Sequence, residues 1–304
     1  MVMATPMPQF DPADFIVEWL TDDAGVFFRR LRTIETIRTQ YQQLDVVETQ
    51  ALGAMFRLDG CNMTSERDEF FYHENIVHPG AIAQHAPEQA LVVGGGDGGS
   101  IEELLKHPSM RRVVMAELDP QVIRMARTHL GSVHCGALDD PRVEIVIGDA
   151  MTYVDAQVHE PEPFDIIVMD LTDPVGPAAA LYTEAFYASL NALLRPTGTL
   201  SLHVGAPFFH PERFVEAIRR LSSVFAIVRP YLVHVPLYGA NWGMACVSQR
   251  TDPMSIPPQD VDMRIAGRRI ERLQFYNGDV HRALFALPNY VRALLRSGGN
   301  AVKA

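Results

Sequence analysis

Cysteine is scarce in this 304-residue chain, and the few cysteines form no motif. The three residues, Cys61, Cys135 and Cys246, lie far apart and include no CxxC pair. This spacing argues against a disulfide framework and against a cysteine-ligated zinc site. Free thiols of this kind are typical of a reducing compartment, and we expect all three to be buried.

Basic residues and long apolar runs are also few. The chain has 26 Lys+Arg against 37 Asp+Glu, a net charge of −11. Such a surface repels nucleic acid and anionic membranes and tolerates cationic ligands. No window reaches the roughly 18 consecutive apolar residues of a membrane span, and the first residues show no signal-peptide pattern. We therefore expect a cytoplasmic protein with neither nucleic acid nor membrane as a partner.

The pattern of hydrophobic residues changes along the chain and predicts two regions. After a mixed start, in which we expect Trp19 to be a packing residue, short β-type segments from about Gln40 predict a small antiparallel sheet. From Ala90 onward, buried-strand patterns such as LVV, VVM, IVI and IIV alternate with helical patterns. This alternation is typical of an α/β fold with a Rossmann-like, doubly wound, mostly parallel sheet. We expect a small N-terminal β-domain over residues 1–64 and a catalytic domain over residues 65–304.

Several local features refine this expectation. Ser65 is placed to cap a helix that runs toward His85, and Pro79 should kink or interrupt it. The segments AIVRPYLVHVPLYG and WGMACVSQ predict two antiparallel edge strands, followed by a polar connection over Thr251–Arg264 and by one or two amphipathic helices. HENIVH does not match a zinc-binding HExxH motif, because its histidines are five residues apart and do not share a helical face.

A glycine-rich turn between a strand and a helix is the strongest local signal. In LVVGGGDGGSIEELL, residues Gly94, Gly96 and Gly99 follow the GxGxxG pattern of a nucleotide-binding turn. Either a dinucleotide or an S-adenosyl compound fits this geometry. The carboxylate of Asp97 favours the second, because it would repel a pyrophosphate and attract an ammonium group.

Acidic residues follow the other predicted strands at the same edge of the sheet. Glu117 ends the second strand and can accept hydrogen bonds from ribose hydroxyls, and Asp149 with Ala150 follows the third strand. The fourth strand ends at Asp170 in DLTDPVGP, with Asp173 three residues later. Carboxylates that converge without basic partners need cationic ligands or metals to neutralise them. Mg²⁺ usually accompanies phosphates, which Asp97 disfavours, so we expect no metal.

Several motifs together resemble the spermidine synthase family, the polyamine aminopropyltransferases. They are LDG, ERDEFFYHE, GGGDGG, KHPSMRRVVMAELDPQVI, FDIIVMDLTDPVGPA and FYNGDVHRALFALP, which occur in order between about Tyr41 and Leu294. The resemblance implies a small β-domain before a Rossmann-like domain of the class I methyltransferase type. It implies transfer of the aminopropyl group of decarboxylated S-adenosylmethionine to an amine, with putrescine the leading acceptor. No further cofactor is implied, and a homodimer or homotetramer is expected.

The resemblance also implies a role for individual residues. Asp170 corresponds to the proton acceptor. The donor-binding positions are Gln42, Asp97, Glu117, Asp149, Ala150 and Pro177. The acceptor-binding positions are Tyr72, His73, Asp173 and Tyr238.

The chain departs from the family pattern at three positions on the acceptor side. Met63 and Ala179 stand where the family usually has glutamine and glutamate, and His203 stands where it often has glutamine. The acceptor is therefore less well defined than the reaction. Two other classes stay open: an S-adenosylmethionine-dependent methyltransferase of a cationic small molecule, and a binding or regulatory protein that has lost turnover.

Overall fold

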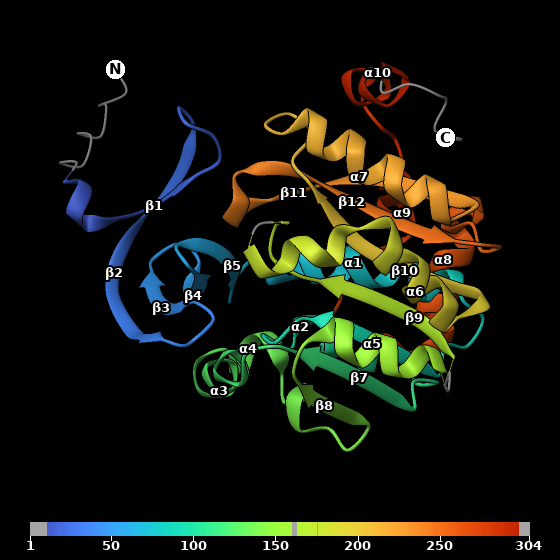
Figure 1. Ribbon diagram of the computed structural model, residues 1–304, viewed down its shortest axis with the longest axis horizontal. Helices are drawn as coiled ribbons and strands as arrows, with labels where there is room; N and C mark the ends of the chain where they lie inside the picture. Colours follow the sequence, from blue (N-terminus) through green and yellow to red (C-terminus); the bar gives the residue numbers. More distant parts are fainter. Residues whose placement is uncertain (1–10, 160–162, 175, 298–304) are drawn as a thin grey trace.

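The computed structural model describes residues 11–159, 163–174 and 176–297, which form two sheets (Figure 1). The first sheet is antiparallel and follows the chain in order. After η1 (Pro12–Asp14), its strands are β1 (Phe15–Trp19), β2 (Gly25–Arg38), β3 (Gln43–Thr49), β4 (Gly53–Leu58) and β5 (Cys61–Ser65). This sheet begins well before the expected Gln40. The domain division at residues 64 and 65 stays a prediction.

The second sheet has seven strands in the order β11-β12-β10-β9-β6-β7-β8. Its parallel strands are β6 (Gln89–Gly94), β7 (Arg112–Glu117), β8 (Val143–Ile147), β9 (Phe164–Asp170) and β10 (Leu194–Gly205). The chain winds outward from β6 to β8 and then returns to β9 on the other side of β6. The switch point between β6 and β9 is where open α/β sheets bind ligands.

Two antiparallel strands complete this sheet, as the sequence predicts. They are β11 (Ile227–Val235) and β12 (Ala240–Ser248), joined by η4 (Pro236–Tyr238). Of these two strands, β11 lies at an edge of the sheet, and β12 lies inside it between β10 and β11. The stretch from Thr251 to Arg264 is not simply a connection, since it contains η5 (Pro253–Ser255) and most of α8 (Pro258–Arg268).

Helices cover both faces of the seven-stranded sheet (Figure 1). Adjacent strand residues point to opposite faces, and Val92 accordingly belongs to one core cluster while Leu91 and Val93 belong to the other. One face packs against α1 (Glu69–Ala83), α2 (Gly99–Leu105) and α3 (Pro120–His129), and the other against α5 (Ala150–His159), α6 (Glu184–Leu193), α7 (Pro211–Val224) and α10 (Asn289–Ser297). The remaining elements are α4 (Gly131–His134), η2 (Ala137–Asp139), η3 (Gly176–Tyr182) and α9 (Gly278–Leu284).

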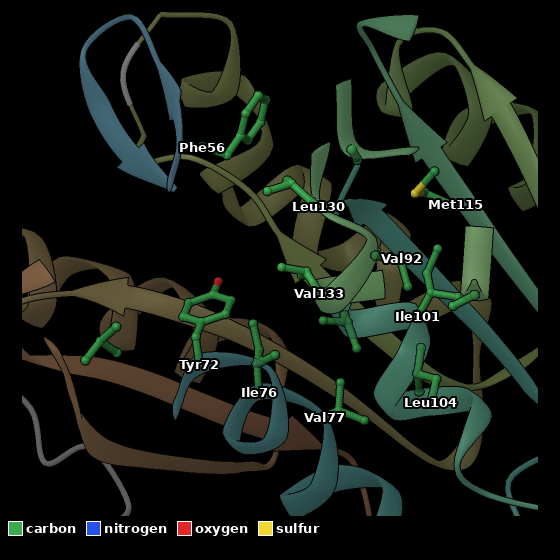
Figure 2. Packing of buried hydrophobic residues seen from close by; sticks show 14 of the residues in the cluster. Phe56, Tyr72, Ile76, Val77, Val92, Ile101, Leu104, Met115, Leu130 and Val133 are labelled. Atoms are coloured by element: carbon green, nitrogen blue, oxygen red, sulfur yellow. The ribbon is translucent and has the colours of Figure 1, made fainter. Parts of the chain in front are cut away.

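The two sheets share one core cluster. Figure 2 shows Phe56 of β4 with Leu130 and Val133, which flank the start of α4, and with Tyr72 and Ile76 of α1 in the same cluster. Phe56 is 1% exposed and Leu130 is 0% exposed. The N-terminal sheet is therefore packed against α1 and the start of α4.

Helix α1 differs from the expectation at its start and at its proline. It begins at Glu69 after Asp68, and Ser65 donates a hydrogen bond to the Asp68 side chain (2.5 Å) without capping the helix. The helix continues through Pro79. Proline leaves the carbonyl four residues earlier without its helical donor. That carbonyl, of Asn75, accepts instead from the hydroxyl of Tyr231 (2.8 Å).

Two expectations about burial were wrong. Trp19 is 68% exposed, because it lies on the outward face of β1, whereas Ile16 on the opposite face is buried. Cys61 and Cys135 are exposed, and only Cys246 is buried. None of the helices in residues 11–159, 163–174 and 176–297 has the length and apolar character needed to cross a membrane.

Candidate active site

Three side chains predicted from separate motifs meet at the switch point. His73 comes from α1, Asp97 from the turn after β6, and Asp170 ends β9. One polar atom from each lies within 4.8 Å of the others. The ends of β6 and β9 are joined directly, because the backbone N–H of Gly95 donates to the carbonyl of Asp170 (2.8 Å). The topology thus brings together residues that are far apart in the sequence.

Asp97 and His73 form a buried charge pair. Nε2 of His73 lies 3.5 Å from Oδ2 of Asp97, and its Nδ1 lies 2.8 Å from Glu69. The other oxygen of Asp97 accepts from the backbone N–H of Gly99 (3.0 Å). Burial alone would lower the pKa of His73, but the Asp97 and Glu69 carboxylates raise it well above its usual value. Although burial opposes ionisation of Asp97, His73 lowers the Asp97 pKa below its usual value.

Asp170 lies in a different electrostatic environment. Burial and the nearby Asp97 carboxylate raise the pKa of Asp170, while His73 and a hydrogen bond from Ser100 oppose that rise. The two aspartates are therefore shifted in opposite directions. A carboxyl group with a raised pKa is suited to accept a proton, and one with a lowered pKa is suited to hold a cation.

Two tyrosines predicted for the acceptor side lie beside Asp170. The rings of Tyr72 and Tyr238 are 6.1 Å apart, and the Tyr238 hydroxyl donates to the backbone carbonyl of Met63 (2.7 Å). Burial, followed by the charge of Asp170, raises the pKa of both tyrosines well above the usual value. Both hydroxyls therefore stay protonated at neutral pH.

Asp173 lies further along the loop after β9 and is more exposed. One of its oxygens is 3.9 Å from Nδ1 of His203, and the other is 3.9 Å from Arg213. His203 also lies 2.8 Å from the carbonyl of Leu171 and accepts from the Trp242 indole N–H (3.3 Å). His203 thus keeps polar contacts at the position where the sequence departs from the family pattern.

The predicted donor-side residues are held by the next strands and by the N-terminal sheet. Glu117 ends β7, and burial raises its pKa to about 7. Its carboxylate accepts from the backbone N–H of Asp119 (2.9 Å). A Cβ on Gly96 would lie 2.9 Å from the Glu117 carboxylate, so glycine is needed there for this close approach. Gln42, between β2 and β3, reaches the same region by donating to Asp119 (3.4 Å).

Asp149 and Ala150 follow β8, the neighbour of β7. The backbone N–H of Gly148 donates to the Glu117 carbonyl (2.9 Å), and Asp149 accepts from the Met151 N–H (2.9 Å). They therefore lie at the strand end next to Glu117. Pro177 lies in η3, but its side chain is outside the described part of the structure.

Comparisons with known proteins agree on one family. Residues 69–256 match the family model of the spermine/spermidine synthase domain. The polyamine aminopropyltransferase of Nitrosomonas europaea is 45% identical over 290 residues, which cover 95% of this chain and 88% of that protein. The polyamine aminopropyltransferase of Bacillus mycoides is 37% identical over 283 residues, covering 93% and 99%. The chain belongs to the spermine/spermidine synthase family. Like its relatives, this aminopropyltransferase acts as a polyamine-biosynthetic enzyme.

Solved structures of the same family confirm the fold. A spermidine synthase in complex with the transition state analogue AdoDATO has a TM-score of 0.86 and 37% identity, covering 93% of this chain and 95% of that chain. The spermidine synthase of Thermotoga maritima has a TM-score of 0.83 and 36% identity, covering 93% and 94%. The predicted Rossmann-like fold with a small N-terminal antiparallel sheet is therefore correct.

Three residues that interact with the predicted site residues were missed from the sequence. Glu69 precedes His73 by one helical turn, a spacing that could have revealed the pair. Ser100 donates to Asp170 across the switch point (2.7 Å). Glu18 of β1 accepts from the backbone N–H of Asn62 (2.9 Å). Burial raises the pKa of Glu18 to about 7, and the Asp173 charge adds to this rise. No local sequence signal marks Glu18.

Proposed function

We propose that the protein transfers the aminopropyl group of decarboxylated S-adenosylmethionine to a linear diamine, with putrescine as the leading acceptor. The products are then spermidine and methylthioadenosine. The observation that carries the proposal is the convergence of His73, Asp97 and Asp170 within 4.8 Å at the switch point. The spermidine synthase neighbour that binds AdoDATO supports the same use of this site.

On the donor side, Asp97 receives the ammonium group of the aminopropyl chain. The lowered pKa of Asp97 keeps it anionic. Glu117 and Gln42 take the ribose hydroxyls, and their common neighbour Asp119 links the two. Asp149, Ala150 and Pro177 line the adenine position. S-Adenosylmethionine carries an additional carboxylate, which Asp97 disfavours by charge repulsion.

On the acceptor side, Asp170 holds the attacking nitrogen and takes its proton. An alkylamine has a pKa near that of lysine, about 10.4, so it arrives protonated and must lose a proton before it can attack. The nitrogen lone pair then forms a bond to the aminopropyl carbon while the carbon–sulfur bond breaks, and the sulfonium leaves as the neutral thioether. The product nitrogen stays a protonated secondary amine, so one proton in total passes from the amine to Asp170 and from there to solvent. Because a sulfonium is already a good leaving group, this step requires no metal or organic cofactor.

Tyr72, His73, Tyr238 and Asp173 complete the acceptor side. The protonated tyrosine hydroxyls border the attacking nitrogen, and His73 fixes Asp97 beside it. A cytoplasmic location and a homodimeric or homotetrameric assembly stay predictions.

The test incubates the protein with decarboxylated S-adenosylmethionine and a panel of diamines and triamines. We expect methylthioadenosine together with an amine lengthened by one aminopropyl unit, formed fastest from putrescine. A parallel reaction with S-adenosylmethionine tests the methyltransferase alternative, whose product is S-adenosylhomocysteine. If no amine releases methylthioadenosine above the level without enzyme, the proposed function is wrong. Donor binding without turnover would then support a binding protein.

A further inference from the structure

We propose that Ser100 is a positioning residue that holds the carboxylate of Asp170 in the orientation needed for proton transfer. The inference rests on the proposed function, in which Asp170 is the base. The Ser100 hydroxyl donates to Oδ2 of Asp170 at 2.7 Å. Ser100 is 0% exposed, so water does not replace its hydroxyl in this contact.

The local fold places Ser100 against the end of β9. Ser100 is the second residue of α2, immediately after the glycine turn. That turn lies very close to Asp170: a Cβ on Gly94 would come within 2.3 Å of the Asp170 carbonyl oxygen, and a Cβ on Gly95 within 3.2 Å of Oδ2. The backbone N–H of Gly95 thus holds the turn to the Asp170 carbonyl, and the Ser100 hydroxyl holds the start of α2 to the Asp170 side chain.

The hydrogen bond has two consequences for a base. It engages Oδ2 and so restrains the orientation of the carboxylate. It also favours the ionised form of Asp170, against burial and the Asp97 charge. The other titratable groups that act on Asp170 come from several elements, namely His73 and Tyr72 of α1, His203 of β10, Tyr182 of η3 and Tyr238 of η4.

A structural role and a positioning role predict different results for Ser100→Ala. If the hydroxyl only stabilises the packing of α2, its loss lowers thermal stability and leaves the pH dependence of kcat unchanged. If it positions Asp170, kcat falls while donor affinity is retained, and the pKa of Asp170 rises. The acid limb of kcat then moves to higher pH. The amine substrate titrates in the same way with wild type and with Ser100→Ala. A displacement between the two pH profiles of kcat therefore reports a change in the protein.

The experiment compares wild type with Ser100→Ala and Ser100→Thr. For Ser100→Ala we expect kcat to fall about 10- to 100-fold, the range for losing a hydrogen bond to a charged group, and the acid limb to move up by about one pH unit. Ser100→Thr keeps a hydroxyl and should restore most of both. The matched control is Ser109→Ala, which removes a hydroxyl hydrogen bond to the Pro87 carbonyl (2.7 Å) away from Asp170. The inference is overturned if Ser100→Ala keeps the wild-type kcat and profile.

A second measurement does not depend on turnover. Carbon-13 NMR titration of the Asp170 carboxyl group, with its signal assigned by Asp170→Asn, should show a higher pKa in Ser100→Ala than in wild type. Equal values would refute the role of Ser100 even if kcat changed. If wild type releases no methylthioadenosine with any amine, the proposed function fails. The NMR comparison then still decides whether Ser100 controls Asp170.

Discussion

Asp97, proposed to bind the ammonium group of the donor, has two contacts that fix its carboxylate. It is paired with His73 at 3.5 Å and accepts the Gly99 N–H at 3.0 Å, so its position is fixed before the donor binds. We predict that Asp97→Asn weakens decarboxylated S-adenosylmethionine by about 10- to 150-fold, the equivalent of a charge-assisted hydrogen bond. S-Adenosylmethionine should lose much less affinity, because its carboxylate is no longer repelled. Calorimetric titration of both ligands measures the difference. Equal losses would indicate that Asp97 only supports the turn.

Glu117 is a buried carboxyl group at which the proposed donor binding and stability conflict. Burial raises its pKa from 4.5 to about 7. The folded protein therefore holds the proton of Glu117 more tightly than the unfolded chain does. This contribution to the free energy of unfolding is complete below the unfolded pKa and is lost as the pH rises through the folded pKa. We predict that Glu117→Gln gains stability over wild type as the pH rises from 5 to 8, reaching about 1–3 kcal/mol. Denaturant unfolding at each pH measures this gain. If the gain in stability does not change with pH, ionisation of Glu117 does not destabilise the wild-type protein.

The same substitution should weaken the donor. An amide offers one acceptor oxygen where the carboxylate offers two for the ribose hydroxyls. A variant that is more stable at pH 8 but binds decarboxylated S-adenosylmethionine less tightly would therefore be the combined expected outcome. Unchanged donor affinity in Glu117→Gln would move the ribose contact to another residue.

Helix α1 contains an unusual solution to an internal proline. Pro79 leaves the Asn75 carbonyl without a helical donor, and Tyr231 of β11 supplies one at 2.8 Å. We predict that Tyr231→Phe destabilises the protein by about 1–3 kcal/mol, the cost of a buried unsatisfied group. Pro79→Ala restores a backbone N–H, so the same tyrosine change should cost less in that background. Urea unfolding of the four proteins gives the coupling energy. Additive effects would mean that the tyrosine hydroxyl does not compensate for the proline.

The sequence predicted the strands of the large sheet and the acids at their ends because both depend on local patterns. Asp97, Glu117 and Asp170 each follow a short apolar run, and parallel topology then brings their side chains to one edge. The inward and outward faces of β1 could not be predicted from the sequence. Phe15, Ile16, Val17 and Trp19 are all apolar, so no alternation indicates that Trp19 faces outward. Ser100 and Glu18 were missed because their contacts depend on how separate elements pack.

For the whole molecule, the net charge of −11 favours the approach of cationic substrates. Asp97, Asp170 and Asp173, which are part of this charge, lie at the proposed site. Salt screens such attraction over about 10 Å at 0.1 M ionic strength. We predict that kcat/KM for the acceptor falls as ionic strength rises, more steeply for a diamine than for a monoamine of equal length, while kcat changes little. Steady-state kinetics from low to moderate salt test this. Identical salt dependence for the two amines would exclude long-range steering by charge.

Asp119 joins the two sheets at the proposed donor site. One of its oxygens accepts the Gln121 N–H at the start of α3 (3.0 Å), and the other accepts the hydroxyl of Thr39 (2.7 Å) and the amide of Gln42 (3.4 Å). A single carboxylate thus serves both a helix of the large domain and a turn of the small sheet. In a chimaera that exchanges the first sheet for that of a relative, the donor affinity would therefore depend on the sequence of the new sheet. Such a chimaera would keep its affinity only where the new turn again presents a hydroxyl and an amide to Asp119.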